Sequence, residues 1–349
     1  MTVTLAVTGP VHAQPQPEGG SKKVRGIGQC SPAVKINAFS DKLDKTTFNG
    51  NFVGNFSALA PAAHGTLEAL SDRSSLFTLS GRHHDDLRPT NVVQLKDENG
   101  QPLDSEAFVI DRDGTRVITS EVGPSIRRYS RDSSTVLASL PVPAELKVTP
   151  AGRATANLTF EGLALQPGGH TLVASMEGAL AGDDSTTVRF QTWHRDSDEQ
   201  EFKLSRQYAY HVDSDAHGTL LGVSDITATG DGRLLVLERG YTAGVGNTVR
   251  LYLADLSHAT DVTAVPDLTG QPAVRLVRKR LLADIGECPS LGAVAKQPQP
   301  NPLLENIEGM AVTGHTREGR LRVTLVSDDN QSATQTTRFY ELTVQLPRH

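Results

Sequence analysis

Pairs of acidic residues recur along this chain, at the two ends of segments whose turn signals predict β-hairpins. In the second of five similar segments, Glu106 opens an apolar run, a turn follows at 111–114, and Glu121 closes the return run. Antiparallel pairing brings Glu106 and Glu121 to the same end of the hairpin. The same spacing pairs Glu161 with Glu177, Asp225 with Glu238, and Glu308 with Asp328. In the first segment Ser57 faces Asp72, so nine of the ten positions are acidic.

Carboxylates that crowd one another predict a bound cation, because their mutual repulsion raises their pKa values until a positive charge neutralises them. A ligand set made only of oxygen suits Ca²⁺ or Mg²⁺, and we expect Ca²⁺. The predicted metal ligands are Glu106, Glu161, Glu308, Asp225 and Asp328. The alternative is structural, with each acid accepting hydrogen bonds from a neighbouring segment or pairing with an arginine. For the second acid of each pair, both interpretations are equally supported.

Arginines recur beside the second acid of three segments. They are Arg73 after Asp72, Arg127 near Glu121, and Arg239 after Glu238. Guanidinium groups match the oxygens of a phosphate as well as those of a carboxylate. We therefore predict a catalytic role for Arg73, Arg127 and Arg239, which would stabilise charge on a phosphate group. The alternative is that they only neutralise the acids next to them.

The elements that carry these residues repeat five times as strand, glycine-containing turn, strand, connection and strand. Successive first positions are 49, 55, 64 and 83 residues apart. Strand-only repeats of about 40–50 residues are typical of β-propeller blades. We predict an all-β fold, a single β-propeller of six antiparallel blades, with five or seven as alternatives. Residues 275–285 would supply strands for a degenerate blade, and a two-sheet sandwich is the competing architecture.

In a propeller the first strand of each blade lines the central channel. Equivalent positions from all blades then form a ring at one mouth of the channel. The acid pairs and their arginines are therefore expected to gather at that mouth.

Composition excludes two classes of partner. The 349 residues include 40 acidic and 34 basic side chains, a formal charge of −6, and this balance does not indicate a nucleic-acid binder. No apolar run reaches 18 residues, so the sequence predicts no membrane-spanning helix. We expect a monomer that acts on a small molecule.

The N-terminus and the two cysteines indicate export. Residues 1–28 are predicted to be the remnant of a signal peptide and a flexible leader, and 29–349 the propeller domain. Val11-His12-Ala13 has the form of a signal-peptidase site, although no basic region precedes it, and an ordinary tail is the alternative. In an oxidising compartment, Cys30 and Cys288 are candidates for one disulfide; the alternative is two separate buried thiols. We expect a secreted, periplasmic or extracellular protein.

Four strings in the chain resemble motifs of a known family. They are FEGLAL (160–165), GRLLVLERG (232–240), NIEGMAV (306–312) and VSDDN (326–330). In this order they are similar to the phytase-like domain family, also described as "esterase-like activity of phytase", from about Ser57 to Val344. The resemblance implies an exported bacterial protein that hydrolyses phosphoesters, with phytate as the nominal substrate. The family's glycine after the first position is replaced by Ala58, Ala107 and Ile226.

These observations lead to one main hypothesis and two alternatives. The main hypothesis is an exported, metal-dependent hydrolase of a small phosphate ester or another anionic ester. The first alternative is a propeller that binds a ligand or partner without catalysis, since a fold does not define a function. The second is a lactonase-like or carboxylester hydrolase. The sequence contains no G-x-S-x-G nucleophile motif, so it does not support an esterase of the hydrolase-fold type.

Overall fold

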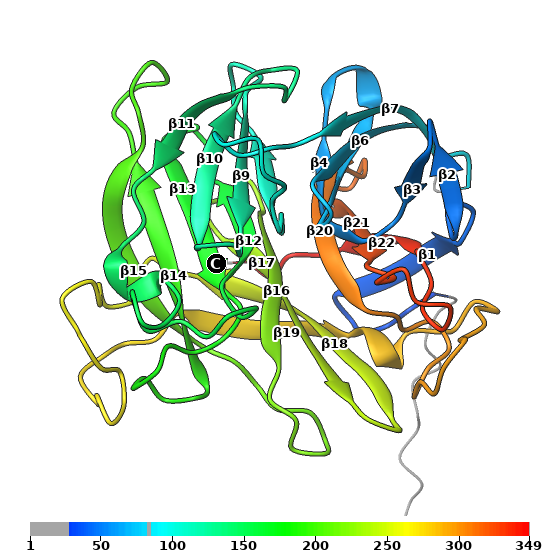
Figure 1. The fold of residues 1–349 in the computed structure, drawn as a ribbon. Coiled ribbons are helices and arrows are strands. Elements are labelled where there is room, and N and C mark those ends of the chain that lie inside the picture. The colour runs from blue at the N-terminus through cyan, green and yellow to red at the C-terminus, as the bar shows by residue number, and fades with distance from the viewer. Residues whose placement is uncertain (1–27, 82–84, 349) are drawn as a thin grey trace, which may run out of the picture.

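The apolar runs of the five repeats form strands, and each repeat folds into one antiparallel sheet. A computed structural model describes residues 28–81 and 85–348 of the chain. In this structure five four-stranded sheets surround a common centre (Figure 1), which is the arrangement of a five-bladed β-propeller. The predicted all-β propeller is confirmed. The leader predicted for 1–28 lies, apart from Gly28, outside the described residues.

The blades follow one another in chain order. Blade one consists of β4 (Phe56–Pro61), β5 (Leu67–Ser71), β6 (Ser75–Ser80) and β7 (Arg88–Gln94). Blade two consists of β8 (Phe108–Ile110), β9 (Arg116–Ser120), β10 (Ser125–Tyr129) and β11 (Val136–Leu140). Blade three consists of β12 (Phe160–Leu165), β13 (Thr171–Met176), β14 (Thr187–His194) and β15 (Lys203–His211). Blade four consists of β16 (Gly222–Ala228), β17 (Leu234–Thr242), β18 (Gly246–Asp255) and β19 (Arg278–Asp284).

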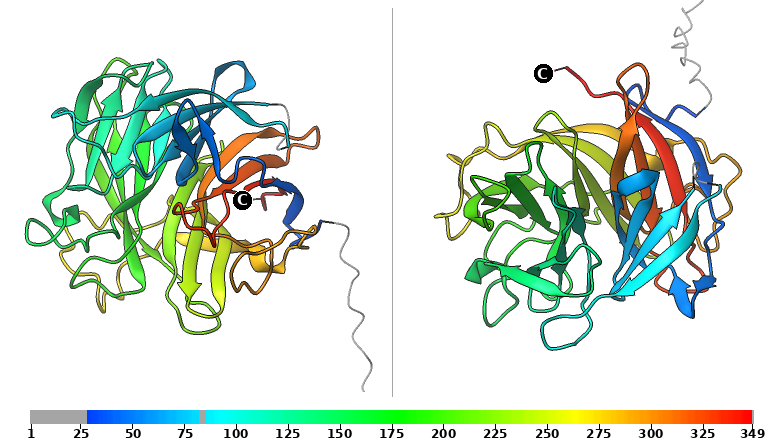
Figure 2. Two further views of the ribbon diagram at one scale, coloured as in Figure 1. Left: turned by 45° about the vertical axis from the view of Figure 1, so that its right-hand side comes forward. Right: turned by 90° about the horizontal axis from the view of Figure 1, so that it is seen from above.

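Blade five closes the ring with strands from both ends of the described chain. It consists of β20 (Ile307–His315), β21 (Leu321–Ser327), β22 (Phe339–Val344) and β1 (Val34–Ser40). The outermost strand, β1, pairs antiparallel with β22, and Figure 2 shows the blue N-terminal strand beside the red C-terminal one. The remaining elements are the hairpin β2 (Thr46–Phe48) and β3 (Asn51–Val53) and three short 3₁₀ helices, η1 (Ala63–Gly65), η2 (Ala144–Leu146) and η3 (Ile285–Glu287). No helix within the described ranges is long and apolar enough to cross a membrane.

The core lies between neighbouring sheets, so the second strand of each blade is largely buried on both faces. In β17, for example, the run from Leu234 to Leu237 is fully buried. One cluster joins blades three and four, where Phe190 and Tyr210 stack and pack with Val236 and Tyr252. Burial on both faces explains the near-continuous apolar runs of these strands.

The predicted count of six blades is wrong, and five is the number observed. Residues 275–285, assigned to a degenerate blade, contain β19, the outer strand of blade four. The fourth strands were missed because they lie at the surface and expose many side chains, as β7 and β19 do. Exposure on one face removes the apolar signal by which strands are recognised.

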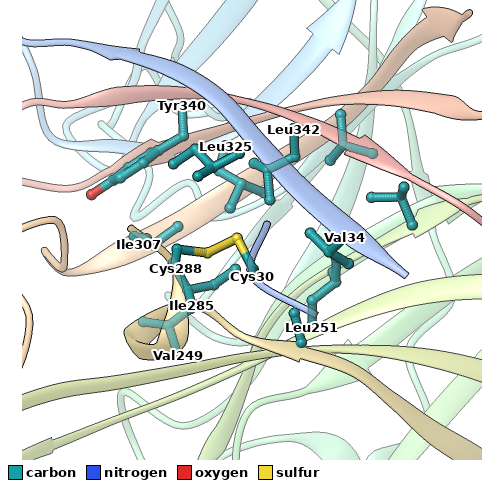
Figure 3. Packing of buried hydrophobic residues seen from close by; sticks show 14 of the residues in the cluster. Cys30, Val34, Val249, Leu251, Ile285, Cys288, Ile307, Leu325, Tyr340 and Leu342 are labelled. Carbon is teal, nitrogen blue, oxygen red and sulfur yellow. A yellow bond between two sulfur atoms is a disulfide. The ribbon is translucent and has the colours of Figure 1, made fainter. Parts of the chain in front are cut away.

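The predicted disulfide between Cys30 and Cys288 is present and joins the segment before β1 to the end of η3. It lies in the largest apolar cluster, among Val34, Ile285 and Leu342 (Figure 3). The bond closes a loop of 258 residues between its two cysteines. It therefore fixes the start of the strand that completes blade five to the connection between blades four and five.

Reduction of this disulfide is expected to lower the free energy of unfolding by about 2–5 kcal/mol, because it removes a long-range constraint on the unfolded chain. Denaturant titration with and without reductant measures the change. The double variant C30S/C288S is the control and should show no response to reductant. Identical unfolding midpoints for the oxidised and reduced wild-type protein would contradict this prediction.

Candidate active site

The inner strands of blades one, three, four and five begin with a bulge, and Glu106 stands at the equivalent position just before β8 in blade two. Pairing skips Ser57 in β4, Glu161 in β12 and Glu308 in β20, since their neighbours on either side pair with adjacent residues of the next strand. In blade four the skipped residue is Ser224. Bulges re-aim side chains at strand ends. The equivalent bulge positions are Ser57, Glu106, Glu161, Ser224 and Glu308.

A second set of equivalent residues comes directly after the second strand in blades one, two, three and five. The N–H groups of Asp72, Glu121, Glu177 and Asp328 donate to the carbonyls of Asn55, Asp104, Thr159 and Asn306, over 2.7–3.0 Å. These bonds place each acid beside the bulge residue of its own blade. In blade four the corresponding residue is Arg239, which pairs with Gly222. The second positions are therefore Asp72, Glu121, Glu177, Arg239 and Asp328.

Two residues of blade four were assigned to the ring out of register. Asp225 lies one position beyond the bulge, and its carboxylate oxygens accept the N–H groups of Ile226 and Met310, both at 2.7 Å. Glu238 lies one position before Arg239 and is fully buried, and it accepts bonds from Tyr210 and Lys279. The structure thus brings together seven of the nine acids. Asp225 instead binds the backbone of blades four and five, and Glu238 binds side chains of blades three and four.

The remaining acids form a cluster with raised pKa values. Burial raises the pKa of Glu106 well above its usual range, and Glu308 and Asp104 raise it further. Burial also raises the pKa of Glu161, with Glu106 and Glu177 adding to the effect. For Glu308, burial raises the pKa to about 7 although Arg239 opposes the shift. These mutual effects show that the carboxyls lie close together in a poorly hydrated place.

Arg239 is the cation within this cluster. Its Nη2 lies 3.3 Å from Glu177 Oε1 and 3.3 Å from Glu308 Oε1, so it bridges blades three and five. Arg73 lies at the rim, with 65% of its side chain exposed and its Nε 3.6 Å from Asp72 Oδ1. Both residues were predicted for the site.

Arg127, the third predicted arginine, has other partners. It lies on β10, where its Nε donates to Glu98 Oε2 at 3.0 Å, and it also contacts Ser125. No contact among the described residues joins Arg127 to the acid cluster, so the structure does not place it with Arg73 and Arg239.

Three carboxylates meet the geometric requirement for a cation. Asp104, Glu106 and Glu121 each offer an oxygen, and the three oxygens lie within 4.8 Å of one another. Two opposed Ca²⁺ ligands are separated by about 4.6–5.2 Å, twice the usual Ca–O distance, so the group fits one ion of this kind. Of these three residues, Glu106 is one of the metal ligands that the sequence predicts. For Glu121 the sequence supports a metal-binding role and a structural role equally.

Asp104 was missed, although the sequence contains a signal for it. A polar residue stands two positions before the bulge in four blades: Asn55, Asp104, Thr159 and Asn306. Extending the repeat by these two residues would also have aligned Gly222-Val-Ser with the other blades, and so corrected the register of Asp225.

Glycines after the bulge allow the inner strands to approach closely. A Cβ on Gly309 would lie 3.0 Å from Ala58 Cα, and one on Gly162 would lie 2.7 Å from the Ile226 nitrogen. Gly222 has a related role, because a Cβ there would lie 2.7 Å from Glu177 Cγ. Small residues at these places therefore hold the acids of neighbouring blades together.

Apolar surface surrounds the cluster on two sides. Behind it, the channel has a volume of about 230 Å³ and is lined by inner-strand residues such as Leu163, Ile226 and Val312. Beside it, Val122, Leu158 and Tyr241 are exposed, next to Glu121, Thr159 and Gly240 in the sequence. The arrangement is a carboxylate-rich mouth with apolar borders.

Fold and site together define a five-bladed β-propeller with an acidic cluster at one mouth of its channel. Residues 51–331 match the model of the Phytase-like family, described as "Esterase-like activity of phytase". The chain belongs to this family, as the ordered motifs predicted. A search of curated protein sequences finds no match.

Solved structures with similar arrangements include a glutaminyl cyclase from Myxococcus xanthus, with a TM-score of 0.43, 12% identity, and coverage of 91% of this chain and 100% of that one. A PQQ-bound aldose sugar dehydrogenase from Streptomyces coelicolor has a TM-score of 0.43 and 14% identity over the same shares of both chains. A luciferin-regenerating enzyme has a TM-score of 0.39 and 12% identity, covering 83% of this chain and 80% of its own.

Without a divalent cation, the protein is expected to lose stability as pH rises from about 4.5 to 7. The folded state holds a proton on Glu308 up to about pH 7, whereas the unfolded chain releases it near 4.5. The folded state therefore binds more protons in this window, and the free energy of unfolding falls, by up to roughly 3 kcal/mol from Glu308 alone.

Denaturant titrations in EDTA between pH 5 and 7 test this expectation. Addition of Ca²⁺ should reverse the loss, and the variant E308Q should flatten the pH dependence. Stability that rises with pH in EDTA over this range would show that the cluster is not under electrostatic stress.

Proposed function

We propose that this protein is an exported hydrolase of phosphate esters that works with a divalent cation, with Ca²⁺ as the best candidate. The observation that carries the proposal is the group of Asp104, Glu106 and Glu121, whose oxygens fit around one ion at the channel mouth. Membership of the Phytase-like family supports hydrolysis of an ester. The arginines beside the acids, Arg73 and Arg239, favour a phosphate ester.

The chain's own groups divide into those that hold the cation and those that meet the substrate. Asp104, Glu106 and Glu121 would hold the cation. Glu161 lies close enough to Glu106 for the Glu106 carboxylate to add to the rise that burial causes in the pKa of Glu161. A bound divalent cation would polarise a phosphoryl oxygen and neutralise these acids. Glu308 and Asp328, which come from blade five, remain proposed ligands.

Arg239 and Arg73 are the groups that would stabilise negative charge on the phosphoryl group. Arg239 has a buried Nε without a hydrogen-bond partner among the described residues, so one donor is available to a ligand. In hydrolysis a water oxygen bonds to phosphorus, the P–O bond to the alcohol breaks, the water proton passes to a base, and a proton returns to the leaving oxygen to give the free alcohol. Ionised Glu161 is a proposed base, because Arg239 already engages Glu177 and Glu308.

Export is proposed on two observations. The disulfide between Cys30 and Cys288 suits an oxidising compartment. The possible signal-peptidase site at Val11-His12-Ala13 lies outside the described residues and rests on the sequence alone. Both are consistent with a periplasmic or extracellular protein.

The variant E106Q is expected to lower kcat/KM for nitrophenyl phosphate by at least about ten- to hundred-fold, because a neutral amide replaces a charged metal ligand. EDTA should abolish the wild-type activity, and Ca²⁺ should restore it. Release of phosphate is the measurement.

Glu318, an exposed acid in the turn between β20 and β21, supplies a matched control. E318Q makes the same chemical change far from the mouth and should retain wild-type activity. Phosphate release that is indifferent to both EDTA and E106Q would overturn the proposed mechanism. Absence of turnover on every ester would favour the propeller that only binds a ligand.

A carboxylester or lactone hydrolase is a second candidate, favoured by the apolar surface around the cluster. Val122 follows Glu121 and Tyr241 lies two residues after Arg239, and they are 62% and 50% exposed. Such side chains suit the acyl or alkyl part of an ester. A divalent cation can polarise a carbonyl oxygen as well as a phosphoryl oxygen.

Paired substrates with the same leaving group distinguish the two candidates. If the site serves phosphate esters, nitrophenyl phosphate should be hydrolysed with a higher kcat/KM than nitrophenyl acetate or butyrate. The variants V122S and Y241S should then have little effect on the phosphate ester. A preference for the butyrate that these two variants abolish would establish the carboxylester hydrolase instead.

A further inference from the structure

Blade one interrupts the ring of acids. Its bulge position is Ser57, where Glu106, Glu161 and Glu308 stand in three other blades. Its second position, Asp72, keeps the carboxylate. Burial raises the pKa of Asp72, while Arg73 and Asn55 oppose the shift, so these two side chains lie beside it. The mouth is therefore less negative at blade one than at blades two and three.

Asn55 has its backbone fixed and its side chain free of good partners. Its N–H donates to Asp329 Oδ1 at 3.0 Å, and its carbonyl accepts the N–H of Asp72 at 3.0 Å. Its φ of 56° is a left-handed conformation that asparagine tolerates better than most residues. Nδ2 and Oδ1 are both buried, and neither makes a well-formed hydrogen bond within the described part of the chain. The amide lies beside the Asp72 carboxyl, whose pKa it lowers, and Nδ2 carries two N–H groups, so at least one remains for a ligand. An amide held in this way is costly unless a ligand or water satisfies it.

Ser57 presents a second buried group of the same kind. The residue is 1% exposed, and its Oγ has no hydrogen-bond partner among the residues that the structure describes. Ser224 occupies the same bulge position in blade four, but its Oγ lies 3.5 Å from the Ile307 carbonyl and is 1% exposed as well. The two serines thus share a position and differ in whether a hydroxyl remains available.

Arg73 connects these groups to the proposed cation site. Its Nε lies 3.6 Å from Asp72 Oδ1. Burial raises the pKa of Asp104, and the positive charge of Arg73 opposes this rise. Asp104 is one of the three carboxylates that fit a cation. The Arg73 guanidinium therefore lies near Asp72 of blade one and near Asp104 of the proposed cation site.

We propose that Asn55, Ser57 and Arg73 form the subsite for the anionic oxygens of the substrate's phosphoryl group. Asn55 Nδ2 and Ser57 Oγ donate hydrogen bonds to these oxygens, and Arg73 adds its charge from the rim. The carboxylates of blades two and three hold the cation on the other side. The reaction at this subsite rests on the proposed function, but the binding of phosphate does not.

Calorimetric titration with inorganic phosphate in the presence of Ca²⁺ tests the subsite directly. The variants S57A and N55G should each weaken phosphate binding about ten-fold or more, the usual effect of losing a hydrogen bond to a charged group. Glycine at position 55 keeps the left-handed backbone conformation without strain. Both variants should bind Ca²⁺ as the wild-type protein does, which also reports that the site is folded.

The matched control is S224A, the same substitution at the equivalent position of blade four. It should leave the affinity for phosphate unchanged. An equal loss in S57A and S224A would show a general effect of the bulge and would overturn the subsite, as would wild-type affinity in S57A and N55G.

The outcome for the proposed function is separate. Phosphate binding that depends on Asn55 and Ser57, without hydrolysis of any phosphate ester, would support the subsite and refute the enzyme. Hydrolysis of a phosphate ester with an unchanged KM in S57A and N55G would support the enzyme and refute the subsite.

Discussion

Close approach of the five inner strands is the constraint on which the site depends. Each blade must bring its first strand to the axis, and β4, β8, β12, β16 and β20 contact one another in turn around the ring. In four blades glycine or alanine after the bulge permits this approach, as at Gly309, where a Cβ would lie 3.0 Å from Ala58 Cα. The same approach forces the bulge side chains into one small volume. Like charges placed there raise each other's pKa values, which Glu106 and Glu161 both show.

Repulsion between these carboxylates is reduced in two ways in this structure. One is an internal cation: Arg239 replaces the second acid of blade four and bridges Glu177 and Glu308. The other is omission of charge, since Ser57 and Ser224 replace acids at the bulges of blades one and four. Neither remedy reaches Asp104, Glu106 and Glu121, which lie together in blade two. Their charge is the part that a divalent cation would neutralise.

The sequence predicts the architecture better than it predicts the membership of the site. The hairpins repeat because β-strand pairing in each blade obeys the same local rules, so the propeller and the pairing of Glu106 with Glu121 follow from spacing. The number of blades does not follow, because outer strands such as β19 expose several polar side chains and resemble connections. Register in blade four fails for another reason. An acid stands one residue from each ring position there, at Asp225 and Glu238, and a pattern built on acids selects those residues first.

Departures from the repeat therefore carry more information about function than the repeat itself. A ring with an acid in every bulge would be symmetric, and it would repel an anionic substrate equally from all sides. This ring is polarised, with a carboxylate group in blade two, an arginine in blade four and a neutral, hydrogen-bonding position in blade one. A phosphate ester needs both kinds of neighbour, because its leaving bond must lie near a cation while its oxygens meet donors. The asymmetry of the five blades supplies an orientation that their common fold alone does not.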